Sequence, residues 1–348
     1  GFIDAHIHLE SSMVTPAEFA KAVVAHGTTT VITDPHEITN VMGIDGVEYM
    51  IQASQNLPID VHFMMPSCVP ATEIDESGAE LDCKDIDLYL DNKKVLGLAE
   101  MMNYVGVING DKNVLSKIVT SQAHHKKIDG HAPELSGNDL NAYIAAGVYS
   151  DHECSTFENA LEKLRKGQFI MIREGTAAHN LKALMPLLTQ QYYSRCMFAT
   201  DDKHPSDLLY GGHIDYIVKQ ALKNGADPIV ALKTATHHAA RYFLLNNKGA
   251  IASGYLPILL LLIILKISML KLFSSVASLF LTAKLRTFLL PQLMKSLPKN
   301  ALTLSTLTAS LRAVSRLTEN SDLSVLSAVN CSHAISAQQI KLMWKTIF

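Results

Sequence analysis

Eight short β-rich runs alternate with helical stretches over the first 255 residues. The runs are FIDAHIHL (2–9), TTTVITD (28–34), DVHFMMPS (60–67), VLGLAEMM (95–102), KIDGHA (127–132), VYSDHE (148–153), FIMIRE (169–174) and CMFATDD (196–202). The stretches between them, such as TPAEFAKAVVAHG and SGNDLNAYIAAG, have a capping residue at the start and a glycine at the end. Strand and helix in strict alternation predict an α/β fold with a parallel sheet, and eight such units predict a (β/α)8 TIM-type barrel over residues 1–255.

Composition limits the kind of partner. A hydrophobic content of 48% is sufficient for a large buried core, and a formal net charge of -3 offers no basic surface for nucleic acid or for a membrane. We therefore expect a small-molecule substrate, with a homodimer as an open alternative to a monomer. The five cysteines are scattered without a CxxC pair, which favours free thiols and a cytoplasmic location.

Polar residues collect where the predicted strands end. In seven of the eight runs the apolar stretch ends in an acid or a histidine, whereas the third run ends in Pro-Ser-Cys. The residues concerned are His6, His8, Asp34, His36, Glu37, Glu100, His131, His152, Glu153, Arg173, Glu174, Asp201 and Asp202. Each alone is more often structural, for example as a helix cap. Together at one end of a barrel they are costly to bury unless they are paired or bind metal.

The spacing of the first two histidines indicates a metal site. His6 and His8 are at positions i and i+2 of a strand, so both side chains face the same side. Together with Glu100, His131, His152 and Asp201 they form a set of imidazole and carboxylate ligands that suits Mn, Fe(II) or Zn. Glu100 could bridge two ions in a binuclear centre that activates water, and Asp201 could relay the proton of that water.

Other strand-end residues have two interpretations each. Asp34, His36 and Glu37 form either a further metal site or a network that supports the ligands. Arg173 either orients the substrate or makes a salt bridge to neighbouring carboxylates. Glu174 and Asp202 are further candidates for substrate binding.

Several segments together resemble a known family. GFIDAHIHLESSMVTPAEFA, HGTTTVITDPHE, PSCVPAT, GLAEMMNY, IDGHAPELSGNDLNAYIAAG, SDHECST, MIREGTAAHNL and FATDDKHPSDLL are similar to the bacterial and archaeal adenine deaminases, within the amidohydrolase superfamily. The resemblance continues from Gly1 to about Tyr255. It implies hydrolytic deamination of adenine to hypoxanthine and ammonia in purine salvage, with a binuclear Mn or Fe centre. It also places Glu100 where many relatives carry a carboxylated lysine.

The implied reaction needs two proton-transfer groups. Asp201 would accept the proton of the attacking water and help to pass it to the departing amine. A second acid is needed near N1 of the purine, and Glu100, Glu153 and Glu174 are the candidates. The sequence does not choose between them.

The resemblance ends near Tyr255. The family-like GAIASGY is followed by LPILLLLIILKISMLKLF, and only Glu319 and Asp322 are acidic beyond it. A membrane helix is disfavoured, because Pro257 and Lys266 interrupt an apolar run that would need ~20 residues. Codons for the family's Ala-Asp-Phe-Val-Val-Val-Asp-Asn, read one base late, encode Pro-Ile-Leu-Leu-Leu-Leu-Ile-Ile, which is the sequence 257–264.

We therefore interpret 256–348 as a frameshifted, poorly ordered second region. Because the chain starts without Met inside a strand, we also expect a fragment that lacks the family's N-terminal part and most of its accessory β-sandwich. Two alternatives to an adenine deaminase stay open. One is another amidohydrolase acting on a cyclic amide or an N-acetyl sugar, and the other is an inactive remnant.

Overall fold

The computed structural model describes residues 1–72, 74–256, 258, 260–261 and 276–277. All eight predicted strands are present, and every pairing between them is parallel. They are β1 (Phe2–Ile7), β2 (Thr28–Thr33), β3 (Asp60–Met65), β4 (Val95–Met101), β5 (Lys127–Gly130), β6 (Ser150–Asp151), β7 (Phe169–Arg173) and β8 (Cys196–Ala199). The predicted TIM-type barrel is confirmed.

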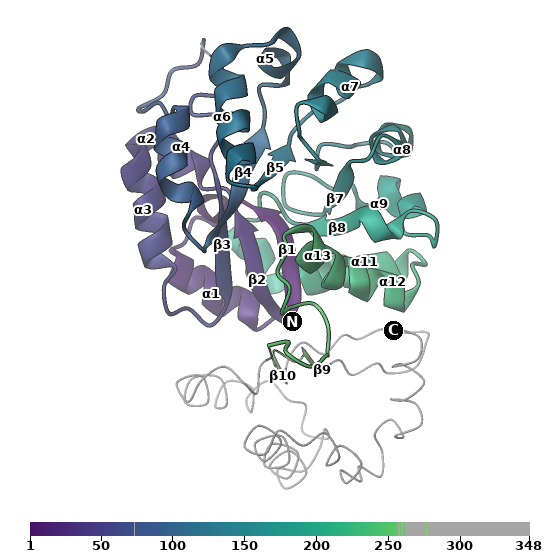
Figure 1. Cartoon of the computed structure of the whole chain (residues 1–348). Coiled ribbons are helices and arrows are strands. Elements are labelled where there is room, and N and C mark those ends of the chain that lie inside the picture. The colour runs from purple at the N-terminus through teal and green to yellow at the C-terminus, as the bar shows by residue number, and fades with distance from the viewer. Residues whose placement is uncertain (73, 257, 259, 262–275, 278–348) are drawn as a thin grey trace, which may run out of the picture. The chain divides into compact units, whose positions relative to one another are not determined.

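Helices surround the strands, as Figure 1 shows. The α-helices are α1 (Pro16–Val24), α2 (His36–Met42), α3 (Ile44–Ala53), α4 (Cys83–Leu90), α5 (Tyr104–Asn109), α6 (Lys112–Ala123), α7 (Gly137–Ala145), α8 (Phe157–Arg165), α9 (Leu181–Leu184), α10 (Pro205–Tyr210), α11 (Ile214–Lys223), α12 (Pro228–Thr234) and α13 (His237–Tyr242). Three short 3-10 helices are η1 (Leu9–Ser12), η2 (Met185–Leu187) and η3 (Tyr193–Arg195).

The barrel consists of two hydrogen-bonded sheets that meet at two seams. One sheet has the order β1-β2-β3-β4-β5 and the other the order β6-β7-β8. At the β8/β1 seam, Asp201 N donates to His6 O at 2.9 Å. At the β5/β6 seam, Tyr149 N donates to Ile128 O at 3.3 Å. At the β8/β1 seam His8 N also donates to Asp201 O at 3.4 Å, which completes an isolated parallel bridge between Ile7 and Asp201. The ladder is therefore continuous within each sheet and reduced to a few backbone contacts at the seams.

An apolar core fills the barrel below the polar strand ends. Small and flexible side chains from the strands pack together there, among them Ala5, Met64 and Met197. Helix α13 closes the N-terminal end of the barrel, because its Tyr242 ring packs against Phe169 at the start of β7. The functional side chains are thus confined to the opposite, C-terminal end.

A register shift in β1 places its histidines. The pairing of β1 with β2 is irregular between Asp4 and Ile7. Ala5 faces the barrel core, and the next residue, His6, also turns inward, with its ring stacked on that of His152 at 4.2 Å. In a regular strand, successive side chains point to opposite sides, so His6 would point out of the barrel because Ala5 points into it. The irregularity therefore brings both histidines of the HxH motif into the barrel mouth.

Helix starts agree with the predicted capping in one case and depart from it in the other. The Thr15 side chain accepts from Glu18 N and caps α1 as expected. Ser136 precedes α7 but makes no side-chain cap bond. The first amide of that helix, Gly137 N, instead donates to Glu162 Oε1 at 2.9 Å. A residue distant in sequence has thus replaced the local cap.

Beyond the barrel, the described part of the chain contains a two-stranded antiparallel sheet of β9 (Leu260–Leu261) and β10 (Val276–Ala277). No helix among the described residues is long and apolar enough to cross a membrane. The interpretation of 256–348 as a frameshifted second region falls mostly outside the described residues. It stays a prediction, as does the domain boundary at 255.

Candidate metal centre

The six predicted metal ligands lie together at the C-terminal end of the barrel. At the end of β1, the two Nε2 atoms of His6 and His8 are 3.2 Å apart, and His8 Nε2 lies 3.1 Å from Asp201 Oδ1. Across the barrel, Glu100 Oε2 lies 2.7 Å from His131 Nδ1 and 3.0 Å from His152 Nε2. Residues from five different strands thus converge on one small region.

These ligands form two overlapping groups that could each hold an ion. His6, His152 and Asp201 form one, and Glu100, His131 and His152 form the other. Within each group the ligand atoms lie within 4.8 Å of one another. Because His152 belongs to both and Glu100 reaches His8 through its second oxygen at 3.3 Å, the groups are contiguous.

The strand-end residues after β2 join the same site. His36 Nδ1 lies 3.1 Å from Asp34 Oδ2 and 3.5 Å from Glu100 Oε1, so these three side chains and His8 form a third possible ligand group. Glu37 Oε1 lies 3.5 Å from His8 Nδ1. The structure therefore brings Asp34, His36 and Glu37 next to the ligands.

The atoms present fit a cation. The facing imidazole nitrogens of His6 and His8 and the oxygens of Glu100 and Asp201 are nearly all buried. Among the described residues, the buried Asp34 Oδ1 has no hydrogen-bond partner. A convergent set of imidazole nitrogens and carboxylate oxygens with an unpartnered oxygen beside it matches the preferences of Mn, Fe(II) or Zn.

Without a cation, the charges of the site are balanced by protons on histidines. Burial lowers the pKa of His8, but hydrogen bonds to Asp201 and Glu100 outweigh it and hold that pKa well above its usual value. Burial and the neighbouring His152 lower the pKa of His6. Against burial, the hydrogen bond to Glu100 raises the pKa of His152 to about 9. A divalent cation could take the place of these protons.

Arg173 joins two carboxylates at the edge of the site. Its Nη2 donates to Glu153 Oε2 at 2.8 Å, its Nη1 contacts Glu153 Oε1, and the same Nη1 donates to Asp201 Oδ2 at 2.5 Å. This matches the salt-bridge interpretation of Arg173. Asp201 itself has φ of 58°, a left-handed conformation that Asp tolerates better than most residues and that is frequent at functional sites.

Glu174 and Asp202 make other contacts. Glu174 Oε1 lies 3.1 Å from His179 Nδ1, and its Oε2 accepts from Leu181 N at 3.2 Å. The carbonyl oxygen of Asp202 accepts from Thr176 N at 2.7 Å. Both residues stabilise the loop after β7, and their role in substrate binding stays a prediction.

The structure adds residues that the sequence did not single out. Ser67, from the Pro-Ser-Cys end of β3, donates to the carbonyl of Glu100 at 2.5 Å and so contacts the backbone of a ligand. Glu10 lies near Glu37, and burial raises its pKa to about 7. The one sequence signal for Ser67 was its position at a strand end, where the other runs carry ligands.

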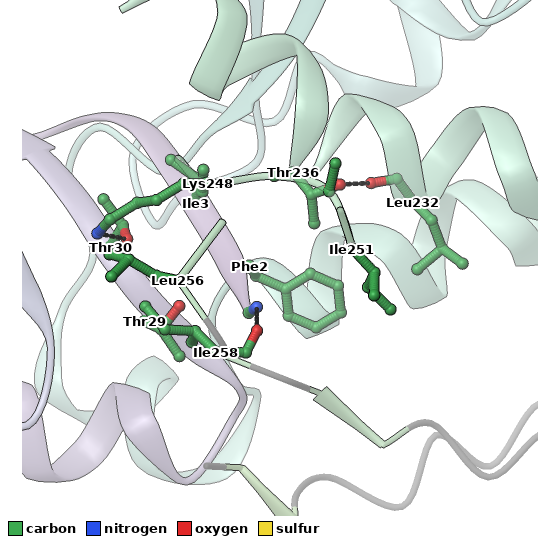
Figure 2. A pocket seen from close by; sticks show the side chains of 13 residues that line it. Phe2, Ile3, Thr29, Thr30, Leu232, Thr236, Lys248, Ile251, Leu256 and Ile258 are labelled. Atoms are coloured by element: carbon green, nitrogen blue, oxygen red, sulfur yellow. Dashed lines mark hydrogen bonds between the residues drawn. The ribbon is translucent and has the colours of Figure 1, made fainter. Parts of the chain in front are cut away.

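A cavity of about 200 Å³ lies at the other end of the barrel. Figure 2 shows Phe2 and Ile3 of β1, Thr30 of β2 and Lys248 around it. Lys248 Nζ donates to Thr30 Oγ1 at 2.8 Å. The lining comes from the N-terminal parts of β1 and β2, from Leu232 and Thr236 and from the segment 248–258, and it includes none of the proposed ligands. This cavity is therefore distinct from the candidate metal centre.

Barrel and polar cluster together are characteristic of metal-dependent hydrolases, and residues 1–286 match the amidohydrolase family. The chain belongs to this family.

Individual relatives narrow the comparison. The chain is 54% identical over 254 residues to an adenine deaminase of Desulfatibacillum aliphaticivorans and 52% identical over 256 residues to one of Kosmotoga olearia. These matches cover 73% of this chain but only 45% and 44% of the relatives, so the chain spans less than half of their length.

Solved structures confirm the fold. A crystal structure of an adenine deaminase matches with a TM-score of 0.53 at 17% identity, over 73% of this chain and 74% of the other. A dihydroorotase matches with the same TM-score at 14% identity, over 76% of each chain. Because structures of both kinds match equally well, the fold does not distinguish between their substrates.

Proposed function

We propose that this chain catalyses the hydrolytic deamination of adenine to hypoxanthine and ammonia at a divalent metal centre. The observation that carries the proposal is the identity of 54% and 52% with two adenine deaminases, over a region that includes most of this chain. The convergence of the predicted ligands supports it. The balanced reaction is adenine plus water giving hypoxanthine plus ammonia.

The proposed ligands are His6, His8, Glu100, His131, His152 and Asp201, with Asp34 and His36 adjoining them. We propose Mn or Fe(II) in a binuclear centre that these residues would hold, and Glu100 could serve both ions because its two oxygens face different histidines. A divalent metal bound there would supply Lewis-acid activation of water.

Asp201 is the proposed proton acceptor. Although burial opposes it, the neighbouring histidines hold the pKa of Asp201 well below its usual range, so this carboxylate is ionised. Its role as proton acceptor is proposed from its position beside the ligands, because the low pKa by itself makes it a weak base. Its Oδ2 is held by Arg173, which leaves Oδ1 on the side of His6 and His8. Arg173 thereby orients the acceptor toward the ligands.

Glu153 is the proposed acid near N1 of the purine. Both oxygens of Glu100 face histidines, and Glu174 turns to His179 and Leu181. Glu153 lies at the edge of the ligand cluster, 3.5 Å from both His131 and His152, and its side chain is 16% exposed. It combines proximity to the metal ligands with access to a substrate. Because Arg173 holds both of its oxygens and favours the carboxylate, Glu153 would have to take up a proton before it acts as the acid.

Further expectations follow from an adenine deaminase. We propose adenine as the small-molecule partner, no nucleic-acid partner, a cytoplasmic location and a role in purine salvage. A homodimer stays a proposal.

The test is a set of hydrolysis assays on the purified full chain reconstituted with Mn²⁺. Adenine is assayed for ammonia release, dihydroorotate for ring opening to carbamoyl aspartate and an N-acetylated amino sugar for acetate release, because the last two reactions yield no ammonia. Turnover of adenine alone is expected. Asp201→Asn should lower kcat by at least about 100-fold, the scale of a lost general base. Asp91→Asn, on the surface beside His124, should leave kcat unchanged.

Two outcomes contradict the proposal. Turnover of one of the other two substrates, without adenine, would indicate a different amidohydrolase. No turnover of any substrate at full metal occupancy would indicate an inactive remnant.

A further inference from the structure

Asp151 and Lys163 form an ion pair inside the protein, away from solvent. Lys163 Nζ lies 3.0 Å from Asp151 Oδ2, and both side chains are 0% exposed. Asp151 is the last residue of β6, and Lys163 lies on the inner face of α8 beside the buried Ala160. Neither residue belongs to the proposed ligand set.

The pair holds the backbone on both sides of the β5/β6 seam. Asp151 Oδ1 accepts from Ala132 N at 2.8 Å, and Asp151 Oδ2 accepts from Glu153 N at 3.0 Å. Lys163 Nζ donates to the carbonyl of Ala132 at 2.5 Å. Ala132 directly follows His131, and Glu153 directly follows His152, so each contact is one residue away from a proposed ligand.

The seam needs these side-chain bonds because it lacks a strand ladder. No ladder joins β5 to β6 among the described strands, which belong to different sheets. The strands nevertheless approach closely, since a Cβ added at Gly130 would lie 2.3 Å from Ser150 O. A second side chain, Tyr143, supports the same loop by accepting at its hydroxyl from His131 N at 3.0 Å.

A gain in folding stability does not by itself explain the buried Asp151–Lys163 ion pair. Replacing a buried ion pair by apolar residues of similar size is often neutral or stabilising. Three backbone groups beside two ligands are, however, satisfied by this one pair. Its geometry therefore fixes the distance between the two loops that carry His131 and His152.

We infer that Asp151 and Lys163 are positioning residues that hold His131 and His152 at metal-binding distance across the β5/β6 seam. The inference rests on the proposed metal centre. It does not depend on which substrate the centre acts on.

The decisive variant is the double substitution Asp151→Asn with Lys163→Met, which removes both charges and leaves no unpaired buried ion. The matched control is Asp60→Asn with Lys248→Met, an acid and lysine pair at the other end of the barrel. We expect the Kd for Mn²⁺, measured by titration calorimetry, to rise about 10- to 100-fold in the first variant. In the control, the Kd for Mn²⁺ should rise less than about 3-fold, because that pair lies away from the residues that support the proposed ligands.

Amide hydrogen exchange in the metal-free protein gives a second readout. The amides of Ala132 and Glu153 should exchange faster in the Asp151 and Lys163 variant and not in the control. If that variant does not fold, Asp151→Asn with Lys163→Gln is measured in the same way, because Asn retains an acceptor for Ala132 N and Gln a donor for the Ala132 carbonyl, with no unpaired buried charge. Wild-type Mn²⁺ affinity together with unchanged exchange would overturn the inference.

Different results would contradict the proposed function and the positioning inference. A wild-type chain that binds Mn²⁺ but does not deaminate adenine would overturn the proposed activity and leave the positioning inference standing. A wild-type chain that does not bind Mn²⁺ would overturn both.

Discussion

Arg173 shows how one side chain controls two others. Its guanidinium contacts both Glu153 and Asp201, and its own side chain is 11% exposed. Against the cost of burial, these carboxylates raise the pKa of Arg173, so the group stays charged at any working pH. Removing it would leave two acids without their shared cation.

We expect Arg173→Met to reduce the free energy of unfolding by about 3 kcal/mol, the cost of breaking a buried pair from one side. Urea denaturation measures it. Arg195→Met is the matched control, because Arg195 contacts the carbonyl of Gly167 and the ring of Phe169 and forms no salt bridge with a carboxylate among the described residues. A loss in the control as large as in Arg173→Met would contradict the ion-pair explanation.

The individual metal ligands could be predicted because the sequence shows both their residue type and their position at the end of a predicted strand. A histidine or an acid at the end of a predicted parallel strand is directed to the barrel mouth by the fold itself. Ser67 and Asp151 were missed, since their function depends on which backbone groups lie beside them. Such partners are set by tertiary packing and leave no spacing pattern.

At the scale of elements, the seam between β5 and β6 depends on a close approach of two backbones. Gly130 lets the two strands approach, because any Cβ there would overlap Ser150 O. The open surroundings of Gly110 provide a contrast, since a Cβ there would meet nothing within 4 Å.

We expect Gly130→Ala to destabilise the chain by about 1–3 kcal/mol through overpacking and also to weaken Mn²⁺ binding, because it separates His131 from His152. Gly110→Ala should cost roughly 1–2 kcal/mol through its positive φ alone. It should leave Mn²⁺ binding unchanged. Denaturation and metal titration of both variants separate the two effects, and equal metal affinities would refute the argument from the seam.

The strands were predictable as elements, and their registers were not. Apolar runs bounded by polar ends identified all eight strands. The irregular register of β1 between Asp4 and Ile7 could not be predicted from the sequence. Both sides of that strand are buried, so no change in the pattern of polar and apolar residues marks the position. The HxH spacing predicts that both histidines face the same side of the strand, as they do. The irregularity explains why Ala5 also faces the inside of the barrel.

At the scale of the whole molecule, stability should depend on pH through His62. This residue on β3 is buried, and burial, followed by the charges of Lys248 and Lys94, lowers its pKa from 6.5 to about 4. Between about pH 4 and pH 6.5, His62 is therefore protonated in the unfolded chain and neutral in the folded chain. Stability is therefore full above about pH 6.5, falls as the pH drops and levels off below about pH 4.

The expected loss is roughly 3 kcal/mol between pH 7 and pH 4. His62→Phe should remove this part of the slope at little cost at pH 7, since neither ring nitrogen has a hydrogen-bond partner. His124→Asn is the control of opposite sign. Asp87, followed by Asp91, raises the pKa of His124, so its stabilisation is present in acid and lost as the pH rises. Denaturation curves at several pH values test both, and an unchanged slope in His62→Phe would contradict the assignment.

The two seams have a consequence for how the barrel assembles. Four of the proposed ligands lie in or directly after strands of the β1 to β5 sheet, namely His6, His8, Glu100 and His131. The other two, His152 and Asp201, follow strands of the β6 to β8 sheet. Every ion held by the proposed ligand groups that include His152 would therefore bridge the two halves. If the proposed ligands bind an ion, metal uptake and closure of the barrel would be linked equilibria, and the supply of the ion would govern how much of the chain is in the closed form.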